Sequence, residues 1–166
     1  MSKTLINFAH ANGFPAGSYQ TLFSYLPTQY KVIALEQYGH DKNYPVENNL
    51  QPQVDELIRF VEKELTVHQQ EKVINVGHSF GGVISFIAAC QRPELFKGLI
   101  MLDPPVFTGP AALALKYIKK TRLIDKFSPA GKAKTRRTHW PLNTDVAKLF
   151  SRRKLFKNFD ERCLHD

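Results

Sequence analysis

The sequence predicts an α/β fold in which helices cover a parallel sheet. Two observations carry this prediction. Short runs rich in Ile, Leu and Val recur along the first two thirds of the chain without alternating with polar residues, and helix-like segments separate them. Such runs are typical of strands that are buried on both faces of a parallel sheet. The alternation of strand and helix favours a doubly wound sheet with right-handed crossovers.

The expected strands are four apolar runs of similar length. They read TLINFA (4–9), KVIALE (31–36), KVINVG (72–77) and GLIMLD (98–103). Each run leads into turn residues. Because ligands of open α/β sheets bind at the carboxyl ends of the strands, the residues after these runs are the candidates for a functional site.

The clearest expected helix covers residues 51–67. Its apolar residues recur at helical spacing and predict a buried face: Val54, Leu57, Ile58, Val61 and Leu65. The charged residues expected to face away are Asp55, Glu56, Glu62, Lys63 and Glu64. Two more helices are expected at 18–26 and 80–91, each ending close to a proline, with Cys90 as a small buried side chain of the second.

Charge divides the chain into two parts. Residues 1–110 hold 8 Lys and Arg against 10 Asp and Glu, whereas residues 111–166 hold 15 against 5. This asymmetry indicates a core of residues 1–110 and a basic segment of residues 111–166. In the basic segment we expect a helix at 111–127, a loop at 128–141 and a helix at 143–159.

Composition favours a cytoplasmic protein without a membrane span, because no apolar run reaches 18 residues and no cleavable leader is evident. The cysteines, Cys90 and Cys163, lack metal-ligand spacing, so we expect no metal. The basic segment carries no nucleic-acid module and is interpreted as a solvated face. The alternative is that its charges attract an anionic substrate, a membrane surface or nucleic acid.

The segment VINVGHSFGG (73–82) runs from an expected strand directly into an expected helix. It contains Gly77-His78-Ser79-Phe80-Gly81, a G-x-S-x-G pattern. In this context the pattern predicts a sharp turn that exposes a nucleophilic serine at a helix N-terminus. The sequence therefore indicates Ser79 as a catalytic nucleophile, and the alternative is an ordinary Gly/Ser loop.

The segment FAHANGFPAG (8–17) follows the first expected strand. Together with the turn around Ser79 it resembles the α/β-hydrolase fold family, which has a His-Gly loop in this place. The resemblance covers residues 4–105 and implies strands three to six of the complete fold, in the order 4-3-5-6. It implies an oxyanion hole made by the backbone N–H groups of Phe80 and Asn12, with Ala11 as the alternative to Asn12. Otherwise His10 and Asn12 only shape the turn.

The sequence offers a candidate for the catalytic acid and none for the catalytic histidine. Asp103 ends the fourth expected strand, so the resemblance makes it a candidate acid; the alternative is a carboxylate that caps the Pro104-Pro105 turn. The family's histidine follows a later strand, and no histidine here occupies that position: His10, His40, His68, His78, His139 and His165. The resemblance therefore predicts a truncated hydrolase without its catalytic histidine.

The resemblance implies a serine hydrolase that acts on a small-molecule carboxylic ester or similar acyl bond without a cofactor. Residues 111–166 then correspond to a helical cap over the site. The alternative is a catalytically incomplete remnant that binds a hydrophobic ligand or a partner. Edge strands without their usual neighbours also predict self-association.

Overall fold

The computed structural model describes residues 3–47, 49–106, 109 and 139–166. The chain divides into two compact units, Met1–Pro105 and Val106–Asp166, and each is described by itself. The expected helix at 111–127 lies outside the described residues, as does most of the expected loop at 128–141.

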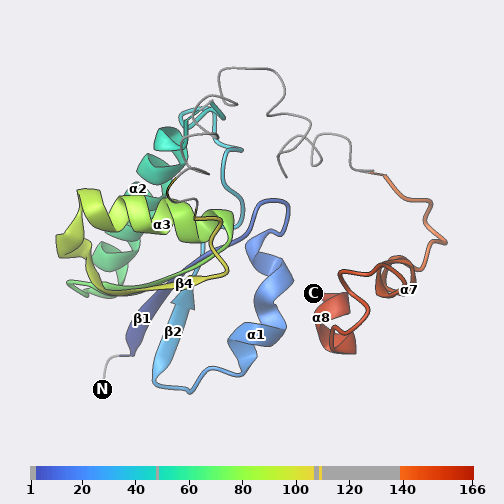
Figure 1. Ribbon diagram of the computed structural model, residues 1–166. Coiled ribbons are helices and arrows are strands. Elements are labelled where there is room, and N and C mark those ends of the chain that lie inside the picture. The colour runs from blue at the N-terminus through green and yellow to red at the C-terminus, as the bar shows by residue number, and fades with distance from the viewer. Residues whose placement is uncertain (1–2, 48, 107–108, 110–138) are drawn as a thin grey trace. The chain divides into compact units, whose positions relative to one another are not determined.

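The first unit is built on a four-stranded parallel sheet (Figure 1). Its strands are β1 (Thr4–Ala9), β2 (Tyr30–Ile33), β3 (Val73–His78) and β4 (Phe96–Leu102). They lie in the order β2-β1-β3-β4, which is the order 4-3-5-6 that the resemblance to the α/β-hydrolase fold family implies. Parallel pairing brings the carboxyl ends of all four strands to one edge of the sheet.

One face of the sheet is covered by α2 (Gln51–His68) and α3 (Phe80–Gln91) (Figure 1). The apolar face of α2 that the sequence predicts is confirmed, because all five of its apolar residues are buried in the main core. The short 3₁₀ turn η2 (Pro93–Leu95) joins α3 to β4. Burial of these side chains in the core supplies much of the driving force for folding.

A buried polar pair crosses the centre of the sheet on this same face. Asn7 on β1 and Asn75 on β3 are partners in the strand register, and both are fully buried. The Asn7 side-chain amide donates to Asn75 Oδ1 at 2.7 Å. Because buried amides are costly without a partner, this hydrogen bond favours the observed alignment of β1 with β3 over a shifted one.

The opposite face of the sheet is partly open. The segment after β1 forms the 3₁₀ turn η1 (Ala16–Tyr19) and the short helix α1 (Gln20–Ser24), close to the expected helix at 18–26. Between α1 and the strands lies an apolar groove of about 340 Å³. Its lining includes Phe8, Leu22, Phe23, Ile74, Ile100 and Leu102.

The strand β4 differs from its prediction. Burial on both faces holds for most of β1, but most β4 side chains, including Ile100 and Leu102, are exposed. The reason is topological, since β4 is an edge of the described sheet and α1 is too short to cover it. Self-association through the edge strands β2 and β4 stays a prediction.

Two side-chain predictions for the helices are wrong. Glu56 is buried rather than solvated, because its carboxylate accepts the backbone N–H of Gly39 at 3.0 Å from the loop after β2. Cys90 is exposed rather than buried. It lies one turn after exposed Phe86, on the side of α3 opposite the buried Ile84 and Ala88.

The described part of the second unit contains two short helices, α7 (Val146–Ser151) and α8 (Glu161–His165). The helix expected at 143–159 is therefore wrong beyond Ser151. Asp145 caps the start of α7 by accepting the Lys148 N–H at 2.9 Å. Continuation past Ser151 would stack like charges four residues apart, since Arg152 follows Lys148 and Lys157 follows Arg153 at that spacing.

Aromatic rings pack together within residues 139–166 of the second unit. Phe150 lies 6.2 Å from Trp140 and 5.1 Å from Phe156, measured between ring centroids. The Arg153 guanidinium lies 4.7 Å above the Phe150 ring. None of the helices in the described part of the chain has the length and apolar character needed to cross a membrane.

The core can be tested by two truncations in α2. Leu57 is fully buried, so Leu57→Ala should lower the free energy of unfolding by about 2–5 kcal/mol. Val67 is 61% exposed, so the matched control Val67→Ala should change the free energy by less than about 0.5 kcal/mol. Urea denaturation followed by circular dichroism measures both, and equal effects would contradict this packing.

Candidate active site

Ser79 occupies a sharp turn between β3 and α3. Its backbone has φ 51° and ψ −114°, a conformation that non-glycine residues rarely adopt and that costs about 1–3 kcal/mol. Its N–H donates to the carbonyl of Leu102 at 2.9 Å, which ties the turn to β4. The sharp turn from strand to helix that the G-x-S-x-G pattern predicts is therefore present at this position. We call residues 77–81 the elbow.

Glycines make this turn possible. A Cβ on Gly81 would lie 2.0 Å from the carbonyl oxygen of Ala9, and one on Gly77 would lie 2.4 Å from the carbonyl oxygen of Gly81. Both distances are far inside van der Waals contact with backbone atoms that have little freedom to move. Only glycine at these positions lets α3 start directly against the ends of β1 and β3.

At the helix start next to Ser79, the Phe80 N–H has no hydrogen bond to a described residue. Ser79 is the N-cap of α3 and Phe80 is its first residue. The first N–H groups of a helix have no intrahelical partner, and the helix dipole favours negative charge there. The Phe80 N–H therefore lies beside the serine as a donor suited to an anion.

The turn after β1 contains the other expected donor. The Phe14 N–H donates to the Ala11 carbonyl at 3.1 Å, and Gly13 has φ 77°. The Ala11 N–H donates to the Tyr19 hydroxyl at 3.2 Å and is therefore already engaged. Of the two donors that the sequence leaves open, Asn12 is exposed and its N–H has no hydrogen bond to a described residue.

His10 lies under this turn and does not face solvent. Its Nδ1 donates to the carbonyl of Ala11 at 2.9 Å, and its Nε2 is buried with no hydrogen-bond partner among the described residues. Burial lowers the pKa of His10, which the Ala11 hydrogen bond only partly offsets. The ring is thus neutral at pH 7, with its proton on Nδ1.

Three rings connect the turn after β1 to the elbow. Tyr38, from the loop after β2, lies 5.0 Å from the His10 ring and 6.1 Å from the Phe80 ring, between centroids. Tyr38 is buried, which raises the pKa of its hydroxyl and keeps it protonated. Tyr38 is not among the site residues predicted from the sequence, although its place just before the Gly39 turn was a signal for it.

The loop after β2 is also held by Glu56, which the sequence predicted to face solvent. The buried Glu56 carboxylate accepts from the Gly39 N–H, and burial raises the pKa of Glu56.

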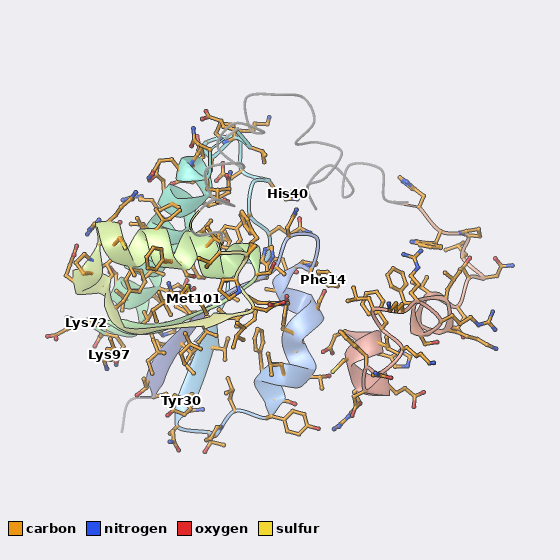
Figure 2. All side chains as sticks on the ribbon, viewed as in Figure 1. Phe14, Tyr30, His40, Lys72, Lys97 and Met101 are labelled. Atoms are coloured by element: carbon orange, nitrogen blue, oxygen red, sulfur yellow. The ribbon has the colours of Figure 1, made fainter. Side chains whose placement is uncertain are left out.

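Figure 2 shows Phe14 and His40 at the carboxyl edge of the sheet, and Lys72 and Lys97 at the opposite edge, where β3 and β4 begin.

Asp103 directly follows β4, next to Ser79 at the end of β3. The register pairs His78 with Leu102, the last residues of β3 and β4, so Ser79 and Asp103 are the first residues after two adjacent strands. Asp103 also has a positive φ, 47°, and is exposed. Its carboxylate has no hydrogen bond to a described residue, and Pro104 and Pro105 have no N–H for it to cap.

No histidine is hydrogen-bonded to Ser79 Oγ within residues 3–47 and 49–106. His78 points its Nδ1 at the Tyr19 hydroxyl at 2.8 Å, and His68 pairs with Glu64 at 3.4 Å. Over the same described ranges and residues 139–166, no group of three or more His, Cys, Asp or Glu side chains gathers as metal ligands would.

Comparison with known proteins shows the family to which the chain belongs. A family model described as the alpha/beta hydrolase fold matches residues 11–158, well over half of the chain. This chain belongs to the alpha/beta hydrolase fold family. It is 28% identical to monoglyceride lipase of Rattus norvegicus over 131 residues, which covers 76% of this chain and 43% of the lipase. It is 26% identical over 92 residues to a human serine hydrolase-like protein, covering 55% of this chain and 45% of that protein.

Solved structures support the fold of this alpha/beta hydrolase. The thioesterase domain from the curacin biosynthetic pathway matches 98% of this chain and 55% of its own, with a TM-score of 0.63 and 19% identity. The monoacylglycerol lipase of Paleococcus ferrophilus matches 73% of this chain and 50% of its own, with a TM-score of 0.53 and 23% identity. The chain thus spans about half the length of these relatives.

The glycine contacts at the elbow give a direct test. Gly81→Ala would force a Cβ against the Ala9 carbonyl and should lower the free energy of unfolding by about 1–3 kcal/mol or more. The control Gly98→Ala on β4 places its Cβ in open space and should change stability by less than about 1 kcal/mol, in the stabilising direction. Urea denaturation compares them, and a neutral Gly81→Ala would show that α3 does not start against β1.

Proposed function

We propose that this alpha/beta hydrolase is a serine hydrolase that cleaves carboxylic esters or similar acyl bonds. The single observation that carries the proposal is the backbone of Ser79, held at φ 51° in a turn between strand and helix. A strained, half-buried serine beside the first N–H groups of a helix is the arrangement that nucleophilic attack on a carbonyl requires. The similarity to lipases and hydrolases agrees with this class of reaction.

In the proposed reaction Ser79 Oγ attacks the carbonyl carbon and its proton passes to an imidazole base. No histidine within residues 3–47 and 49–106 is hydrogen-bonded to Ser79 Oγ, so labelling of Ser79 also tests whether the chain holds this base. The carbonyl oxygen becomes an oxyanion, and the N–H groups of Phe80 and Asn12 donate to it. The imidazole then gives the proton to the leaving alcohol, and water releases the acyl group by the same steps in reverse. The reaction uses no cofactor.

Asp103 is proposed as the acid that orients the imidazole. Asp103 directly follows β4 and Ser79 directly follows β3, so both lie at the carboxyl edge of the sheet. The Asp103 carboxylate has no hydrogen bond to a described residue. The competing role, capping the turn that follows, is weakened because both turn residues are prolines. An acid in this position fixes the tautomer of the base and stabilises its charged form.

The nucleophile can be tested with a fluorophosphonate probe. The wild-type chain should be labelled on Ser79, and Ser79→Ala should abolish the labelling, because the probe phosphonylates activated serine hydroxyls. Ser24→Ala, which removes an exposed hydroxyl from α1, is the matched control and should be labelled like the wild type. Intact-protein mass spectrometry measures the adduct.

Fast labelling that depends on Ser79 requires a working base and would rule out the reading of the chain as a non-catalytic remnant. If the chain shows neither labelling nor turnover of an aryl ester, the proposed activity is wrong for this chain.

The acid can be tested with Asp103→Asn. Asparagine tolerates a positive φ, so the substitution removes the charge and keeps the backbone. The labelling rate constant should fall by about 10²- to 10⁴-fold if this carboxylate orients the base. Asp55→Asn, on the exposed side of α2, should leave the rate unchanged, and an unchanged rate in Asp103→Asn would place the acid elsewhere.

A second candidate function is binding of an apolar small molecule such as a fatty acid. The observation that favours it is the open groove of about 340 Å³ between α1 and the strands. A chain that binds a fluorescent fatty acid and shows no labelling of Ser79 would favour this function over hydrolysis.

A further inference from the structure

The backbone of Ala11 is held on both sides. Its N–H donates to the Tyr19 hydroxyl at 3.2 Å. Its carbonyl accepts from His10 Nδ1 at 2.9 Å and from the Phe14 N–H at 3.1 Å. Since the peptide is planar and trans, the carbonyl of Ala11 and the N–H of Asn12 point in opposite directions. Fixing Ala11 therefore fixes the direction of the Asn12 N–H.

The Tyr19 hydroxyl makes a second hydrogen bond. It lies 2.8 Å from His78 Nδ1, and His78 is the residue immediately before Ser79. The hydroxyl accepts from the Ala11 N–H, and its one proton and second lone pair let it donate to or accept from His78 Nδ1, according to the tautomer of that imidazole. One oxygen atom thus joins the turn after β1 to the elbow after β3.

The Tyr19 ring is anchored independently of its hydroxyl. It packs against Phe8 at 4.7 Å and Phe23 at 6.3 Å, between centroids. Burial raises the pKa of Tyr19, which keeps its hydroxyl neutral across the physiological range. Removal of the hydroxyl alone therefore leaves the ring contacts in place and breaks only the two polar ones.

We propose that Tyr19 is a positioning residue that aligns the oxyanion donors. Through Ala11 it holds the Asn12 N–H, and through His78 it holds the elbow that carries Ser79 and the Phe80 N–H. The two donors come from loops far apart in the sequence, and an oxyanion hole works only if both meet one oxygen atom. This inference rests on the proposed function.

The test compares Tyr19→Phe with wild type and with Tyr44→Phe, which removes a hydroxyl from a half-buried tyrosine outside the site. Amide hydrogen exchange measured by NMR reports on the loop without any need for catalysis. In Tyr19→Phe the Ala11 amide should exchange about tenfold faster, because it loses its acceptor. The rate constant of fluorophosphonate labelling at saturating probe should fall about 10- to 100-fold, with the probe concentration at half-saturation unchanged.

The outcomes separate the two proposals. Unchanged exchange of the Ala11 amide, or labelling of Tyr19→Phe at the wild-type rate, overturns the role of Tyr19. A comparable loss of labelling in Tyr44→Phe also overturns it, since the effect would then be general. If wild type itself is not labelled, the proposed function fails and the catalytic role of Tyr19 fails with it, while the exchange data still decide whether Tyr19 holds the loop.

Discussion

The close approach of α3 to the end of β1 is the constraint on which the site depends. Gly81 lies so near the Ala9 carbonyl that any Cβ on Gly81 would collide with it. A Cβ on Gly77 would likewise collide with the carbonyl of Gly81. Because Gly77 and Gly81, two residues before and two residues after Ser79, have no side chains, the chain can turn sharply here, and Ser79 takes up the strain in its positive φ. The reversal leaves the first N–H groups of α3 beside the serine. The strain of about 1–3 kcal/mol is small against the burial of the core that holds α3 in place.

The loops that surround the elbow are also held by contacts with it and with one another. The turn after β1 has its carbonyls against α3, and its Ala11 backbone is fixed by His10 and Tyr19. Tyr38 packs its ring against both His10 and Phe80, so the loop after β2 joins the same assembly. Side-chain contacts thereby connect the segments that follow β1, β2 and β3. A rigid site of this kind suits a reaction that depends on fixed donors rather than on flexible ones.

The sequence predicted the strands and the elbow because each rests on a local signal: apolar runs, the turn residues that follow them and the spacing of glycines. The order of the strands was predicted only by the resemblance to the α/β-hydrolase fold family. It could not predict what depends on long-range contacts. Glu56 reads as a solvent-facing residue on the charged side of α2, and only the loop that brings Gly39 to its carboxylate explains its burial. Tyr19 reads as an ordinary helix aromatic, since its partners Ala11 and His78 are distant in the sequence. The helix expected beyond Ser151 failed because helical spacing alone ignores the repulsion among its basic residues.

The central claim is that Phe80 and Asn12 form an oxyanion hole for an acyl group on Ser79. The most direct measurement is a crystal structure of the chain with a phosphonate covalently bound to Ser79 Oγ. The account predicts one phosphonyl oxygen within about 2.7–3.1 Å of both the Phe80 nitrogen and the Asn12 nitrogen, with the Ala11 N–H still on the Tyr19 hydroxyl. A phosphonyl oxygen bound to the Ala11 N–H, or facing solvent with neither donor near it, would contradict the account.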